Sequence, residues 1–227
     1  MTPDGVDDPN HAMWLGRWDE GRIGFHEPLV NGWLTHCADD LVHADGGVVL
    51  IPLCGKTVDI PWLIARDVSV VGVELAKRAV EDLHAENRIE AAVTTEGAQQ
   101  VWRSPGLTIY QGDFFALDPS VVGPCDAVWD RAAMIALPPE QRGAYVEHVM
   151  RFLRPGARVL LVALVYDESK MDGPPYAVPT AEVESGFSRH ARVVKIGTRD
   201  VTTGNPRFVR SGLDEVHEVA FLITARE

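Results

Sequence analysis

The hydrophobic residues of this chain gather in short runs, and polar segments of helical length separate most of them. The runs VVLIPL and VSVVGVEL, at 48–53 and 68–75, are apolar almost throughout, as in strands that a parallel sheet buries on both faces. Further strands are predicted at residues 107–112, 126–129, 157–166, 193–197 and 215–223. Helices are predicted between them, at residues 57–66, 77–87, 138–153 and 180–186.

This alternation predicts an α/β fold with a doubly wound, mostly parallel, seven-stranded sheet and right-handed crossovers. The last two strands are expected to form a C-terminal antiparallel hairpin. Residues 1–10 are polar and are expected to be a disordered tail, with a single domain over residues 11–227. Residues 11–36 are rich in aromatic side chains, some at helical spacing. Loops or turns are predicted at residues 94–106, 154–156 and 167–179.

Composition narrows the range of functions. A length of 227 residues suits one large α/β domain, and a net charge of -12 disfavours nucleic acid and anionic membrane surfaces as partners. The three cysteines form no CxxC pair or zinc spacing, so no metal site is expected and a reducing, cytoplasmic location is favoured. Neither a secretory signal nor a membrane span is apparent. We expect a monomer that acts on a small molecule.

Candidate ligand-binding residues follow the first two strands, because open parallel sheets bind ligands beyond the carboxyl ends of their strands. Gly55, in the turn LCGK, can adopt a positive φ and let a ligand approach the backbone. Glu74 ends the second strand 19 residues later, where a carboxylate can accept hydrogen bonds from a ribose diol. NAD and S-adenosylmethionine both carry that ribose, so Glu74 does not discriminate between them. The missing G-x-G-x-x-G counts against NAD.

Two further strand ends carry candidates with two interpretations each. Asp113 and Phe114 follow the third strand, where an acid and an aromatic ring suit an adenine. Asp113 is equally suited to cap a helix. Arg131 follows the fourth strand, at the centre of the sheet edge, where it contacts a ligand or forms a structural ion pair with Asp130.

Five motifs in order resemble the thiopurine S-methyltransferase family, in particular its bacterial branch. They are W-x3-W-x2-G-x2-G-F-H (14–26), PLCGK-x2-D (52–59), V-x-G-V-E (70–74), V-W-D-R (128–131) and Y-D-x4-D-G-P-P-Y-x-V-P (166–179). The resemblance extends from about residue 12 to residue 224. It implies a class I methyltransferase with a Rossmann-like fold that uses S-adenosyl-L-methionine and releases S-adenosyl-L-homocysteine.

The resemblance also implies roles for individual residues. An N-terminal lid over the cofactor, at about 11–36, would include Trp14, Trp18 and Phe25. The cofactor would be bound by Leu53 and Gly55 on its methionine side, Glu74 at the ribose, Asp113 and Phe114 at the adenine, and Arg131 near the methyl group. The methyl acceptor would lie beside Phe25, Arg131 and Arg207, with Arg131 as the catalytic residue. Two departures are Ala132, in place of a frequent glycine, and the loosely matching loop 198–210, which contains Arg207.

The implied reaction is methyl transfer to the sulfur of a thiopurine or a similar aromatic or heterocyclic thiol. Proximity and a dry aromatic pocket would accelerate it, so a strong general base is optional, and His26 and His36 are interpreted as structural. Alternative acceptors are halide, thiocyanate, small thiols and tellurium or selenium species. Other classes are an NAD-dependent oxidoreductase, disfavoured by the aromatic N-terminal segment, and a non-catalytic cofactor-binding module, which would have little use for Arg131.

Overall fold

The computed structural model describes residues 9–42 and 46–226. Most of the disordered tail predicted at 1–10 lies outside the described residues. Its last two residues, Pro9 and Asn10, belong instead to the first helix, α1 (Pro9–Asp19). That helix begins the aromatic N-terminal segment, which continues through a loop into α2 (Gly32–Leu41).

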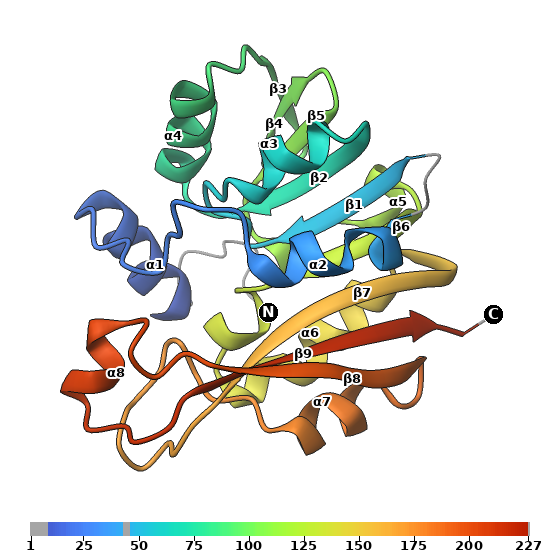
Figure 1. The fold of residues 1–227 in the computed structure, drawn as a ribbon. Coiled ribbons are helices and arrows are strands. Elements are labelled where there is room, and N and C mark those ends of the chain that lie inside the picture. The colour runs from blue at the N-terminus through green and yellow to red at the C-terminus, as the bar shows by residue number, and fades with distance from the viewer. Residues whose placement is uncertain (1–8, 43–45, 227) are drawn as a thin grey trace.

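The described residues form one nine-stranded sheet with the order β3-β4-β5-β2-β1-β6-β7-β9-β8 (Figure 1). The strands are β1 (Gly47–Pro52), β2 (Val68–Glu74), β3 (Ala92–Glu96), β4 (Gln99–Ser104), β5 (Leu107–Gln111), β6 (Cys125–Asp130), β7 (Leu153–Val165), β8 (Ala191–Asp200) and β9 (His217–Ala225). The five central strands β5, β2, β1, β6 and β7 run parallel, and each edge carries an antiparallel pair. The predicted doubly wound, mostly parallel fold and the antiparallel C-terminal strands are therefore confirmed.

Helices cover both faces of the sheet, as a doubly wound fold requires. The remaining helices are α3 (Asp59–Ile64), α4 (Lys77–Asn87), α5 (Pro119–Val122), α6 (Pro139–Met150), α7 (Thr180–Phe187) and α8 (Pro206–Arg210), with 3₁₀ turns η2 (Phe114–Ala116) and η3 (Met134–Ala136). One hydrophobic cluster joins α2, α3 and α4 to the sheet, and a second joins α6 and α7 to it. Within the described residues, no helix is long and apolar enough to cross a membrane.

The loop predicted at 94–106 is wrong, because that segment forms the hairpin β3–β4. Its two-residue turn begins at Gly97, whose φ of +61° suits the first central position of a hairpin turn. All five residues of β3 are exposed, so the strand carries no apolar run that would have revealed it. This hairpin raises the number of strands from the predicted seven to nine.

The turn predicted at 154–156 is also wrong, because these residues lie within β7. Gly156 has a φ of +75°, and the pairing of β6 with β7 shifts register between Cys125 and Ala127. The irregular start of β7 therefore keeps the Arg-Pro-Gly sequence inside the strand, where proline and glycine are tolerated at bulges.

Gly72 lies in the central strand β2, where the packing leaves no room for a side chain. An added Cβ would lie 2.4 Å from Ile109 Cδ1 and 2.9 Å from Cys54 Sγ, and both of these residues are buried. Neither neighbour can withdraw without displacing the core around it. Glycine at position 72 therefore brings the turn after β1 into contact with β2.

We expect Gly72→Ala to lower the free energy of unfolding by about 1–3 kcal/mol through overpacking. The matched control is Gly143→Ala in α6, where nothing lies within 4 Å of the added methyl group. That substitution should raise the free energy of unfolding by about 0.5–1 kcal/mol, because alanine is the better helix former. Urea unfolding of both variants measures the two effects. A Gly72→Ala protein as stable as the original would contradict this account of the packing.

Candidate active site

A cavity of about 850 Å³ opens at the carboxyl ends of the parallel strands. Its wall contains all ten residues singled out in the sequence, which are Trp14, Trp18, Phe25, Leu53, Gly55, Glu74, Asp113, Phe114, Arg131 and Arg207. They come from the N-terminal segment, from the turns after β1, β2, β5 and β6, and from α8. The fold thus brings together side chains that are up to 193 positions apart, counting from 14 to 207.

The turn after β1 has an unusual backbone. Leu53 has a φ of +49° and Gly55 a φ of +54°, and a left-handed conformation is uncommon for a residue such as leucine. The turn is fastened to β2, since Cys54 N donates to Val73 O at 2.9 Å. A Cβ at position 55 would lie 3.2 Å from the Trp18 ring. Glycine therefore lets the N-terminal segment rest on the backbone of this turn.

Glu74 is buried at the end of β2, and its carboxylate holds two turns together. Oε2 accepts from Gly55 N at 2.7 Å, and Oε1 accepts from Ala76 N at 2.7 Å. Burial raises the pKa of Glu74 to about 7, although these backbone hydrogen bonds oppose the shift. A carboxylate has about four acceptor positions, so it can also accept hydrogen bonds from hydroxyl groups in the cavity.

Asp113 and Phe114 follow β5 and open the 3₁₀ turn η2. Asp113 caps this turn, because its Oδ1 accepts from Phe115 N at 2.9 Å, and it also lines the cavity. The Phe114 ring is only 4% exposed, and it stacks on Phe152 with the ring centroids 5.7 Å apart. Phe115 lines the cavity beside it and is less buried. Phe114 therefore supports the cavity wall from the core side.

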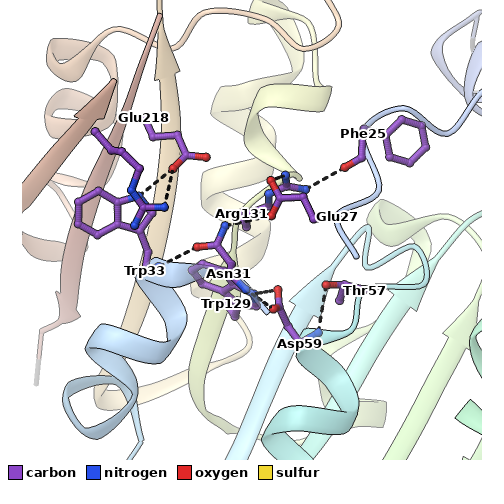
Figure 2. A network of polar contacts seen from close by, with 10 residues as sticks. Phe25, Glu27, Asn31, Trp33, Thr57, Asp59, Trp129, Arg131 and Glu218 are labelled. Atoms are coloured by element: carbon purple, nitrogen blue, oxygen red, sulfur yellow. Dashed lines mark hydrogen bonds and ion pairs between the residues drawn. The ribbon is translucent and has the colours of Figure 1, made fainter. Parts of the chain in front are cut away.

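Arg131 does not use Asp130 as its partner. Asp130 accepts from Tyr145 Oη at 2.7 Å and from two backbone N–H groups, and burial raises its pKa to about 6. Arg131 reaches the N-terminal segment instead: Nη1 donates to Phe25 O at 3.1 Å, and Nη2 forms an ion pair with Glu27 (Figure 2). The sequence offered a structural ion pair between Arg131 and Asp130 as one interpretation. In the structure, Arg131 contacts Phe25 and Glu27 of the N-terminal segment instead.

The aromatic residues of the N-terminal segment pack on one another. The Phe25 ring makes edge-to-face contacts with Trp14 at 5.3 Å and with Trp18 at 5.5 Å between ring centroids. Trp18 is buried and packs beside Ala76 and Ala79 at the start of α4. Trp14, Trp18 and Phe25 all line the cavity, so this cluster is the part of its wall that the N-terminal segment supplies.

A buried carboxylate anchors the segment where it enters α2. Asp59 Oδ1 accepts from Asn31 N at 2.9 Å, and Asp59 Oδ2 accepts from Trp129 Nε1 at 2.8 Å (Figure 2). Asn31 in turn caps α2, and Trp33 Nε1 donates to Glu218 of β9 at 2.9 Å. The N-terminal segment is therefore held by α3, which is itself bonded to β6, and by β9.

Arg207 lies in α8 and fastens the proline-rich loop 167–179. Its two terminal nitrogens donate to Pro174 O at 2.6 Å and to Asp172 O at 2.7 Å. Carbonyl partners leave the charge of the guanidinium in place. Arg207 thus combines a structural contact with a position in the cavity wall.

Sequence reasoning missed several residues of the cavity wall, notably Glu27, Arg17 and Arg210. Glu27 follows directly on the G-F-H motif, but its partner Arg131 is 104 positions away and no local pattern links them. Burial, and then the nearby charge of Arg207, lowers the pKa of Arg17. His26 also lines the cavity, and burial lowers its pKa, whereas His36 is exposed and lies outside the wall.

Several solved structures that share this fold are named as methyltransferases. A magnesium protoporphyrin IX methyltransferase from Synechocystis, solved with bound S-adenosylmethionine, superposes with a TM-score of 0.61 at 15% identity, covering 99% of this chain and 100% of that one. A 1,6-didemethyltoxoflavin N1-methyltransferase from Burkholderia thailandensis was solved with S-adenosylhomocysteine. It superposes with a TM-score of 0.61 at 15% sequence identity, covering 100% of this chain and 94% of that one. At this identity the likeness concerns the fold.

Sequence comparison is more specific. The family model described as thiopurine S-methyltransferase matches residues 9–226. Thiopurine S-methyltransferase of Pseudomonas entomophila is 42% identical, with 94% of this chain and 98% of the relative covered. The thiopurine S-methyltransferase of Nitrosospira multiformis is 39% identical, with 94% of this chain and 97% of the relative covered.

The family match, together with the fold and the cavity at its strand ends, defines a class I methyltransferase that uses S-adenosylmethionine as cofactor and methylates a small molecule. The chain belongs to the thiopurine S-methyltransferase family. Two observations of the cavity fit this cofactor. The buried carboxylate of Glu74 can accept from a ribose diol, and Leu53 and Gly55 of the neighbouring turn line the same cavity.

The raised pKa of Glu74 predicts how ligand affinity depends on pH. The ionised carboxylate is the better acceptor for a diol, so protonation should weaken binding of S-adenosylhomocysteine by up to about fivefold between pH 7 and pH 6. Folding stability should respond in the opposite direction. The folded protein keeps a proton that the unfolded chain loses near pH 4.5, so this contribution to stability decreases as pH rises from 4.5 to about 7.

Titration calorimetry from pH 5.5 to 8 tests the first effect. Glu74→Gln is the control, because its amide does not titrate and its affinity should be lower and nearly independent of pH. An identical pH dependence in the variant would assign the effect to another group and contradict the ribose contact.

Proposed function

We propose that this enzyme transfers the methyl group of S-adenosylmethionine to the sulfur of a thiopurine or a similar aromatic or heterocyclic thiol. The observation that carries the proposal is the position of Arg131 in the wall of the same cavity as Glu74 and the aromatic N-terminal segment. The names of the relatives, at about 40% identity over nearly the whole chain, support the same class of acceptor.

The cofactor would lie along the turns that follow β1, β2 and β5. Glu74 would accept from the ribose hydroxyls, while Asp113 and Phe114 would flank the adenine. Leu53 and Gly55 would contact the methionine end, which directs the sulfonium toward Arg131. Trp14, Trp18 and Phe25 would act as a lid over both ligands, in a single domain whose N-terminal segment is this lid.

The acceptor would occupy the part of the cavity between Phe25, Arg131 and Arg207. Bound S-adenosylmethionine supplies the methyl group and a good leaving group, so the protein's task is to align the acceptor with it. Phe25 and its aromatic neighbours exclude water, which favours a transition state of dispersed charge. The positive charge of Arg131 favours the thiolate form of the acceptor sulfur, and hence the form that attacks. No general base is required for a thiol that is already acidic.

The sequence favours a cytoplasmic monomer that binds neither nucleic acid nor membranes, and we retain this as part of the proposal. The acidic net charge of -12 supports it. Five arginines line the cavity, but the net charge of the chain as a whole remains acidic.

Replacement of Arg131 provides the test. Arg131→Ala should lower kcat/KM for 6-mercaptopurine by about 30- to 1,000-fold, which corresponds to roughly 2–4 kcal/mol of lost transition-state stabilisation. Arg131→Lys should recover only part of the loss, because an ammonium lacks the planar fork that contacts Phe25 O and Glu27 together. Affinity for S-adenosylhomocysteine, measured by calorimetry, should change far less.

Arg22→Ala is the matched control, since Arg22 also lines the cavity but is exposed and paired with Glu20. It should retain most of the activity. Unchanged turnover in a folded Arg131→Ala protein would remove Arg131 from the catalytic machinery, and loss of cofactor affinity equal to the loss of activity would make its role structural.

A further inference from the structure

The ion pair between Glu27 and Arg131 places a negative charge beside the proposed acceptor position. Both residues line the cavity, and their side chains are 43% and 23% exposed, so each can be reached by a ligand. Figure 2 shows the Glu27 carboxylate against the guanidinium, with the Phe25 carbonyl on the other side. The charge of Arg131 is therefore offset by Glu27 before any acceptor enters.

Other arginines in this cavity lack such a partner. Arg17, Arg207 and Arg210 line it, and within the described residues no carboxylate oxygen lies within 4 Å of their guanidinium nitrogens. Arg17 and Arg207 both line the cavity, and burial, followed by the charge of Arg207, lowers the pKa of Arg17. Without Glu27, this side of the cavity would attract anions strongly.

We propose that Glu27 is a specificity-determining residue that penalises methyl acceptors carrying a negative charge in addition to the reacting sulfur. The inference rests on the proposed function, in which the acceptor lies beside Arg131. An anionic substituent that lies beside Arg131 must either displace Glu27 or remain near the negative charge of Glu27. A neutral acceptor meets neither penalty, since repulsive elements distinguish ligands as effectively as attractive ones.

The charge of Glu27 is separable from its structural contacts. The segment is also held by the hydrogen bond from Arg131 to Phe25 O and by the hydrogen bond from Asn31 N to Asp59. The other contact of Glu27 is a long one, 3.4 Å from Asn31 Nδ2. A glutamine at position 27 keeps the side-chain length and an oxygen that accepts from Arg131, so Glu27→Gln removes the charge and leaves the geometry in place.

A matched pair of acceptors isolates this charge. 4-Mercaptobenzoate and 4-mercaptobenzamide share the ring and the thiol and differ in the charge of the remote substituent. We expect Glu27→Gln to raise the ratio of kcat/KM for the benzoate to kcat/KM for the benzamide by about tenfold, the effect of one unit charge about 10 Å away at an effective dielectric constant near 20. The value for the benzamide should rise less than the value for the benzoate, because the reacting sulfur carries its only negative charge.

Glu20→Gln is the control, because Glu20 is an exposed carboxylate of the same segment that lies outside the cavity wall. Its ratio should equal that of the original protein. An unchanged ratio in Glu27→Gln overturns the proposal, and so does an equal fall for both acceptors, which would indicate a purely structural role.

A different outcome would count against the proposed function itself. If the original protein methylates neither thiol, the proposed acceptor class is wrong. Calorimetric affinities of the two compounds, with S-adenosylhomocysteine present, then replace kcat/KM. A tenfold rise of the benzoate-to-benzamide affinity ratio in Glu27→Gln would still support the charge effect, and an unchanged ratio or the absence of binding would overturn it.

Discussion

The hydrogen bonds of one buried carboxylate, Asp59, hold the N-terminal segment of the cavity wall where that segment enters α2. Asp59 accepts hydrogen bonds from Asn31 N of the N-terminal segment and from Trp129 Nε1 of β6. It therefore joins the N-terminal segment to the central strands. The residues before Asn31 supply the aromatic side of the cavity. Since a buried acceptor without its donors is costly, this arrangement has one favourable geometry. The positions of Phe25 and Glu27 relative to Arg131 follow from it.

Buried carboxylates recur at this edge of the sheet, and neutral donors hold them. Asp59, Glu74 and Asp130 are each bonded to backbone, tryptophan or tyrosine donors, and within the described residues no Lys or Arg nitrogen lies within 4 Å of their oxygens. Burial raises the pKa of Glu74 and Asp130 as a result. Arg17, Arg207 and Arg210 line the cavity from α1 and α8. Of the three buried carboxylates, Glu74 is the one that lines the cavity and can meet a ligand there.

Local patterns predicted the parallel strands, because β1, β2 and the core of β7 are continuous apolar runs. They also brought Gly55 and Glu74 into one site, since both lie at the carboxyl ends of adjacent strands. Local sequence patterns did not predict contacts between residues far apart in the chain, nor strands whose side chains are exposed. The strand β3 has no buried residue, and its pairing with β4 depends on the turn at Gly97. Glu27 and Arg131 are 104 positions apart and meet only in the folded chain, so the spacing of residues in the sequence could not predict that they pair.

The antiparallel direction of β9 has a consequence for how the protein can be handled. Because β9 runs opposite to the central strands, its last residues lie at the amino-end edge of the sheet, away from the cavity and from α1 and α8 (Figure 1). The helix α1 begins at Pro9 and supplies Trp14 and Trp18 to the cavity wall. An affinity tag, fluorescent fusion or surface linker attached after β9 would therefore leave the ligands free to enter and depart. The same attachment ahead of Pro9 would act directly on the helix that covers them.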